Sequence, residues 1–201
     1  MFLRNVIAGG EHNGEREKIE IDIDGLQERM IAKALNLDEY TYIMNRIRRT
    51  DVSHDRDFQR IYDHFYKVRR NEAWRESYFD YFEKMKDAPD LTFEKVLDAL
   101  FLMTGNIEAS FSSKLIATLF PDMPIWDQYV LKNLGLKMPT GSRSTQLRAA
   151  KRLYQEICQW YEEYLPTENA TACVQAFDKM LPHYTHISKV KKIDFVLWSN
   201  R

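Results

Sequence analysis

The spacing of apolar residues constrains the fold of this chain more than any other feature. From Gly25 onward they recur every three or four positions in one segment after another. That spacing places them on one face of an α-helix. Residues that end helices, such as Pro121 and Pro166, stand between the segments, and the whole chain has only seven glycines and six prolines. The pattern predicts an all-α fold.

Helix starts are predicted at residues whose side chains accept hydrogen bonds from the free amides of a first turn. The positions chosen on this basis are Asp38, Thr92, Asp127, and Thr167 or Asn169. Asp55 or Asp57 is predicted to open another helix, and a further helix is predicted from Asn71 to Met85. Further helices are predicted over residues 26–35, 108–119 and 145–164, and over the closing VKKIDFVLW.

The first 24 residues follow a different pattern, so we treat 1–24 as an N-terminal extension and 25–201 as the helical domain. LRNVIA and KIEIDID alternate or are β-branched, and GGEHNG between them has the composition of a turn. This pattern allows a small β-hairpin.

Composition restricts the class of protein and its partners. With 44% hydrophobic and 29% charged residues, and no apolar run of about eighteen residues, the chain has the makeup of a soluble globular protein without a membrane span. Cys158 and Cys173, without a pairing framework, fit the reducing cytoplasm. The net charge of −1 hides an asymmetry, because residues 128–155 contain no acid. The basic residues of that segment are Lys132, Lys137, Arg143, Arg148, Lys151 and Arg152. Local basic surface attracts phosphate, although a solvated helix face has the same composition.

The stretch MTGNIEASFSSKLIATLFPDMPIWDQYVLKNLGL carries the candidate chemistry. A turn with Gly105 precedes a predicted helix, and amides at such a helix start can hold a phosphate. Asp127 opens the next helix, whose amides would keep its carboxylate ionised. The stretch therefore combines an expected phosphate site with a fixed negative charge.

This stretch resembles the helix-hairpin-helix DNA glycosylases, whose pattern is roughly L-P-G-V-G-x-K-T-A followed by V-D-x-x-V-x-R. Aligned without a gap, Gly105 falls on the first Gly, Ser110 on the Thr and Asp127 on the catalytic Asp, while Lys132 falls on the final Arg. The closing KKIDFVLWSNR is also similar to the end of some members. The resemblance covers about a third of the chain.

The resemblance implies two helical lobes with a cleft between them, and hydrolysis of the bond between a modified or mispaired base and deoxyribose. The partner would be DNA, expected to be double-stranded with one base flipped out. Asp127 would be the catalytic residue. The expected DNA contacts are Gly105, Asn106, Ser110, Lys114, Lys132, Arg69, Arg70 and Arg143, and Trp74 and Trp126 would form the base pocket.

The chain departs from the family pattern at two positions. Ile107 replaces the second Gly of the hairpin, and Ala109 replaces the lysine that forms a Schiff base in bifunctional members. A monofunctional enzyme is therefore expected, with Lys114 as a substitute amine or, more simply, a residue that faces solvent or phosphate. Two cysteines exclude an iron–sulfur cluster, and His183 and His186 have no evident third metal ligand. We expect no cofactor and no metal.

Each of these assignments has a structural alternative. Asp127 is also a good helix N-cap, Trp74 and Trp126 fit a helical core, and the serines after Gly105 can cap a buried helix start. For the whole protein, the alternatives are a DNA-binding relative without catalysis and a helical protein-interaction module, the latter suggested by near-neutral charge and abundant tyrosines.

Overall fold

The computed structural model describes residues 3–5, 19–21, 30 and 35–199. Two short strands, β1 (Leu3–Asn5) and β2 (Ile19–Ile21), pair antiparallel and are the described part of the N-terminal extension. The other described elements are α2 (Leu35–Arg46), α3 (Arg56–Tyr66), α4 (Glu72–Met85), α5 (Phe93–Thr104), α6 (Ala109–Leu119), α7 (Gln128–Asn133), α8 (Arg143–Tyr164), α9 (Glu168–Met180), the 3-10 turn η1 (Pro182–Tyr184) and α10 (Lys189–Ser199). The all-α prediction is confirmed. The helix predicted over 26–35 lies outside the described residues, except for its positions 30 and 35.

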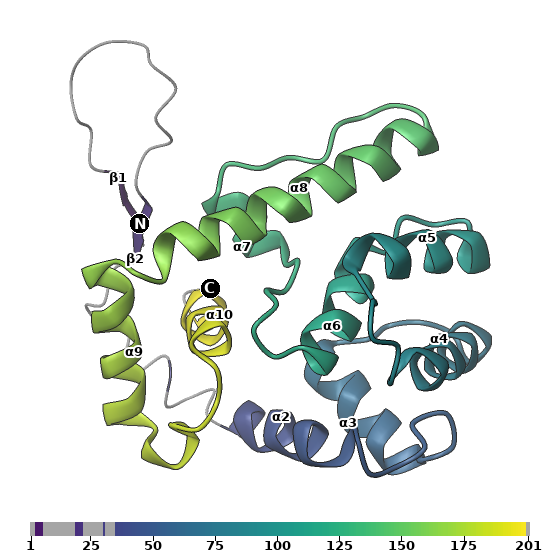
Figure 1. Ribbon diagram of the computed structural model, residues 1–201, viewed down its shortest axis with the longest axis horizontal. Helices are drawn as coiled ribbons and strands as arrows, with labels where there is room; N and C mark the ends of the chain where they lie inside the picture. The colour runs from purple at the N-terminus through teal and green to yellow at the C-terminus, as the bar shows by residue number, and fades with distance from the viewer. Residues whose placement is uncertain (1–2, 6–18, 22–29, 31–34, 200–201) are drawn as a thin grey trace.

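The helices form two groups (Figure 1). α3 to α6 gather on one side, α9 and α10 lie on the other, and α8 passes over both. Lys151 of α8 pairs with Asp98 of α5 at 2.6 Å, while Tyr161 of α8 donates a hydrogen bond to Asp194 of α10. α2 packs on α3 and joins the groups on the opposite side from α8. This arrangement agrees with the two predicted lobes.

Capping residues explain most helix starts. Asp55, Asn71, Thr92 and Thr167 each accept a hydrogen bond from an amide in the first turn of α3, α4, α5 and α9 respectively, as predicted for Thr92 and Thr167. The prediction for Asp38 was wrong, because α2 begins three residues earlier and Asp38 lies in its first turn.

The start of α8 was also predicted too late. The helix begins at Arg143, because Ser142 caps it by accepting a hydrogen bond from the Thr145 amide. Ser142 lies three residues before the predicted start, and a serine there serves equally as the last loop residue and as an N-cap.

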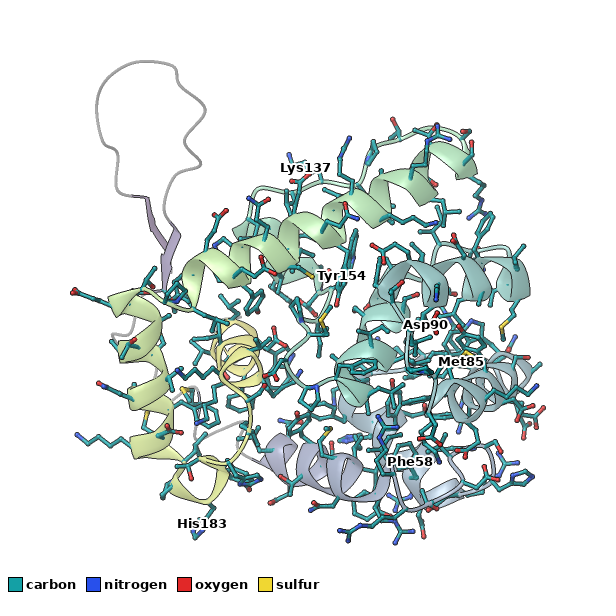
Figure 2. The ribbon with its side chains drawn as sticks, viewed as in Figure 1. Phe58, Met85, Asp90, Lys137, Tyr154 and His183 are labelled. Atoms are coloured by element: carbon teal, nitrogen blue, oxygen red, sulfur yellow. The ribbon has the colours of Figure 1, made fainter. Side chains whose placement is uncertain are left out.

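Aromatic side chains form much of the core. Phe58 begins a buried row on α3 that continues through Tyr62 and Tyr66 and packs on Tyr78 of α4 (Figure 2). The Tyr62 and Tyr78 hydroxyls lie 2.8 Å apart, and the Tyr66 hydroxyl lies 3.0 Å from Thr118 Oγ1. These buried hydroxyls therefore have partners, as burial requires.

A second part of the core lies between α5 and α8. Tyr154 points from α8 into the space next to α6 (Figure 2), and its ring stacks on Phe93 with centroids 3.8 Å apart. Its hydroxyl donates to the Pro124 carbonyl at 2.9 Å. Tyr154 thus connects α8 to the linker between α6 and α7, which carries Asp127.

Candidate functional site

A cleft of about 410 Å³ opens between the two groups of helices. Its walls come from the start of α2, the end of α3, α6, the start of α7 and α10. Asp127, the predicted catalytic residue, lines this cleft. The volume falls within the range usual for sites that bind small molecules or single nucleotides.

Asp127 is also the N-cap of α7. Its Oδ1 accepts a hydrogen bond from the Tyr129 amide at 2.8 Å, and the residue is half-buried. The two interpretations of this aspartate are therefore compatible, because one carboxylate oxygen caps the helix while the residue borders the cleft. The hydrogen bond fixes the side chain at the start of α7.

Hydrogen bonds from α6, from α8 and from the residue that precedes α10 hold the linker before Asp127. The Trp126 amide donates to Ser113 Oγ of α6 at 2.8 Å in a buried position. Ser188, just before α10, donates to the Pro121 carbonyl at 2.7 Å, and Tyr154 of α8 contacts the linker as described above. The position of Asp127 is thus set by contacts from both groups of helices.

Lys191 and Asp194 of α10 also line the cleft, although both are almost fully buried. Lys191 Nζ donates to Asp194 Oδ2 at 3.1 Å, and the Tyr161 hydroxyl donates to Oδ1. Burial raises the pKa of the Asp194 carboxyl, while Lys191 and the Tyr161 hydrogen bond lower it and the charge of Asp127 raises it. The net result is a raised pKa for Asp194. The charge of Asp127 contributes to it, so the ionisation of one carboxylate in the cleft depends on the other.

Sequence reasoning did not identify Lys191 and Asp194 as site residues. Every position of α10 from Val190 to Leu197 is buried, so this part of the helix has no solvent face for its charges. The sequence signal that could have found them is the i, i+3 Lys–Asp pair that directly precedes the apolar run from Phe195 to Trp198.

Basic side chains outnumber acidic ones in the cleft. Lys67 and Arg69 are exposed at its edge, and Lys114 is half-buried, with its Nζ 2.9 Å from the Tyr66 carbonyl. Together with Lys191 they make four cations against two carboxylates. Lys67 also has a φ of 56°, a left-handed conformation that is uncommon outside glycine. The net positive charge favours an anionic ligand.

The helical turn expected to bind phosphate lies around a different hollow. Arg70, Asn106, Ser110 and Arg143 line a hollow of about 590 Å³ together with Trp126. The structure thus separates the predicted site residues into two sets. Asp127, Arg69 and Lys114 belong to the cleft, and the turn does not face Asp127 across it. Lys132 is exposed on α7 and lines neither space.

The amides of the turn already have acceptors. The Gly105 amide donates to the Phe101 carbonyl at 2.8 Å, and the Asn106 amide donates to Thr104 Oγ1 at 3.1 Å. Gly105 has a φ of 68° and ends α5, so it serves as a helix C-cap. The expectation that these two amides are available for a phosphate was therefore wrong.

The two tryptophans of the predicted base pocket pack against other aromatic side chains. Trp74 stacks on Tyr78 with centroids 4.9 Å apart, and Trp126 is 7% exposed and stacks near Phe93, so both belong mainly to the core. Neither lines the cleft with Asp127. The aromatic side chains that do so are Phe65, Tyr66, Tyr129, Phe195 and Trp198.

Part of the basic segment 128–155 is neutralised. Lys151 pairs with Asp98, and Arg152 lies 3.5 Å from Glu156. Lys132, Arg143 and Arg148 are exposed, as is Lys137 on the outer edge next to α8 (Figure 2), and within the described residues none of them has an ion pair. These four remain available for an anionic partner.

Neither a metal site nor a membrane-spanning helix is found in the described part of the chain, and the comparisons with known proteins identify no relative. Across the described ranges, no three His, Cys, Asp or Glu side chains converge as metal ligands, and His183 lies at the outer edge beyond α9 (Figure 2). No helix in the described part of the chain is long and apolar enough to cross a membrane. Compared with models of protein families, with curated proteins and with solved structures, the chain matches none.

Proposed function

We propose that this protein is a monofunctional DNA glycosylase of the helix-hairpin-helix type, which hydrolyses the N-glycosidic bond of a modified or mispaired base. One observation supports this above all. Asp127, the residue that the sequence resemblance assigns to catalysis, borders a nucleotide-sized cleft with an excess of positive charge. An aspartate that served only as a helix N-cap would not need to border this cleft.

In the proposed reaction, the bond from the base nitrogen to the sugar C1′ breaks, and the base leaves with the bonding electron pair and takes up a proton from solvent, to which Asp127 afterwards returns the proton that it takes from water. Positive charge develops on the sugar as the base departs. The Asp127 carboxylate, held by the Tyr129 amide, stabilises this charge and takes a proton from the water whose oxygen bonds to C1′.

The remaining cleft residues have complementary roles in this proposal. Lys67 and Arg69 at the edge bind the phosphates that flank the flipped nucleotide. Phe65, Tyr129 and Trp198 offer stacking surfaces for the extruded base. Substrate recognition is thus assigned to the cleft rather than to the two tryptophans predicted from sequence.

The test is a panel of oligonucleotides that carry different lesions, scored for free base. Asp127→Asn keeps an oxygen that can accept from the Tyr129 amide, so the cap and the fold should survive. We expect unchanged DNA affinity and a loss of base release of at least about 10²-fold, the scale of one electrostatic group. Undiminished release by this variant would exclude Asp127 from the mechanism.

A non-catalytic DNA-binding protein is the second candidate. The amides of the turn that are engaged within the chain, together with Ile107 and Ala109, favour it. It predicts salt-dependent DNA binding without base release from any lesion. The interaction-module alternative has lost its main support, because the tyrosines that suggested it are largely buried. The buried ones include Tyr40, Tyr62, Tyr66, Tyr78, Tyr154, Tyr161 and Tyr164.

A further inference from the structure

Glu108 is an acid in an unexpected position between α5 and α6. Its side chain is only 4% exposed, and it directly precedes α6 without capping it through its side chain. Oε2 pairs with Arg70 Nη2 at 2.7 Å, but Oε1 is buried and has no hydrogen-bond partner among the described residues. A buried carboxylate oxygen without a partner is costly, and native proteins seldom retain one without a reason.

Glu108 lines the same hollow of about 590 Å³ as the turn. The apolar part of its wall comprises Ile107, Phe111, Trp126, Leu131 and Met138. Asn106 and Gln146 add amide groups, and Arg143 is an exposed cation at the start of α8. An apolar wall with a few polar groups is the usual lining of a site for a flat heterocycle.

The chemistry of these groups identifies the ligand class. A carboxylate oxygen without a partner accepts hydrogen bonds only, so the ligand must present N–H donors to Glu108. Guanine has two donors side by side, N1–H and the 2-amino group, whereas the other bases place an acceptor next to their donor on this edge. That acceptor would repel the carboxylate. Arg143 carries the charge that a phosphate attached to such a base requires.

We propose that the hollow lined by Glu108 binds guanine, either as a free nucleotide or as a base within a DNA strand. N1–H and the 2-amino group donate to the Glu108 carboxylate, and the ring lies against the apolar wall that includes Trp126. This site is separate from the cleft of Asp127, and the inference does not depend on glycosylase activity.

The wild-type chain provides the first test, by calorimetric titration with GMP, IMP and AMP. IMP differs from GMP only in lacking the 2-amino group, so it loses one hydrogen bond to a charged acceptor. We expect GMP to bind about tenfold more tightly than IMP, and AMP to bind more weakly than either. Equal affinities for GMP and IMP, or no heat with GMP at millimolar concentration, would overturn the proposal.

Glu108→Gln is the matching variant, because its amide replaces one carboxylate oxygen with a donor of similar size. We expect the preference of GMP over IMP to disappear in Glu108→Gln and to persist in Asp127→Asn. Circular dichroism verifies that both variants are folded. A preference that survives Glu108→Gln in the folded protein would also refute the assignment.

A third arm distinguishes the two sources of guanine. Thymidine single strands with one central guanine or one central inosine are titrated in the same way. A preference for guanine in the strand supports nucleic acid as the ligand, whereas a preference confined to GMP supports a free nucleotide. If neither series discriminates, the hollow has no guanine site.

Discussion

At the scale of single residues, the two carboxylates of the cleft have different environments. Asp127 is half-buried and receives a hydrogen bond from the Tyr129 amide. Asp194 is buried, and its pKa is raised mainly by burial, although Lys191 and Tyr161 hold it in place. Of the two, Asp127 is therefore the one suited to stabilise a cation, and Asp194 the one suited to hold Lys191 at the base of the cleft.

Asp55 shows how a carboxylate at a helix start contributes to stability. It accepts hydrogen bonds from the Phe58 amide, Arg46 and Thr50, and these lower its pKa from 3.8 to about 2. A lowered pKa in the folded state means that the stabilisation is complete above about pH 4 and is lost as the pH falls through about 2.

We predict that Asp55→Ala lowers the free energy of unfolding by about 1–2 kcal/mol at pH 7, and that the deficit shrinks as the pH falls from about 4 towards 2. Urea denaturation across this pH range measures both. Asp57→Ala is the matched control, because this acid lies in the same first turn but is exposed and is not the N-cap. It should change stability by no more than about 0.5 kcal/mol. A deficit independent of pH would contradict the assigned role of Asp55.

At the scale of elements, a few side-chain hydrogen bonds hold the linker between α6 and α7 in place. Ser112 and Ser113 are adjacent on α6 and both completely buried, yet their hydroxyls have different roles. Ser113 Oγ accepts from the Trp126 amide, whereas Ser112 Oγ donates to the Glu108 carbonyl one turn earlier in its own helix region. Of these two serines, only Ser113 connects α6 to the linker by a hydrogen bond.

This difference predicts a difference between two alanine variants. Ser113→Ala leaves the buried Trp126 amide without an acceptor and should cost about 1–3 kcal/mol of stability. Ser112→Ala removes a hydroxyl whose bond duplicates the backbone bond to the same carbonyl, so it should cost less than half as much. Thermal and urea denaturation compare the two. Equal losses would show that the contact with Trp126 does not hold the linker.

Capping residues and apolar spacing predicted most helices, but not which helices pack against each other. Thr92 and Thr167 were identified as caps because capping depends on residues within one turn. The separation of the turn at Gly105 from Asp127 depends on how α5, α6 and α7 pack, which no local pattern contains. Lys191 was not predicted as a cleft residue for the same reason. It belongs to α10, at the far end of the chain, and only tertiary packing brings this helix to the cleft.

At the scale of the molecule, the two hollows lie on either side of the same short segments. Arg69 lines the cleft and Arg70 the hollow of the turn, and Asp127 and Trp126 are divided in the same way. Neighbouring residues thus face different spaces at two places in the chain. A DNA strand laid over these segments could present one nucleotide to each space, which would connect the proposed reaction to the proposed guanine site.

Such a strand must be held by cations that the protein has not already neutralised. Arg70 is paired with Glu108, but Arg69 is exposed, lines the cleft and has no ion pair within the described residues. Each phosphate contact releases a counterion, so the logarithm of affinity falls with the logarithm of salt concentration by about 0.9 per contact.

We predict that Arg69→Gln weakens DNA binding and lowers this slope by about one. Lys179→Gln, an exposed position of α9 that lines neither hollow, is the control and should leave the slope unchanged. Fluorescence anisotropy over a series of salt concentrations measures the slope for each variant. If both variants bind like the wild type, DNA does not cross the cleft, and if the wild type is not retained even at low salt, the partner is not DNA.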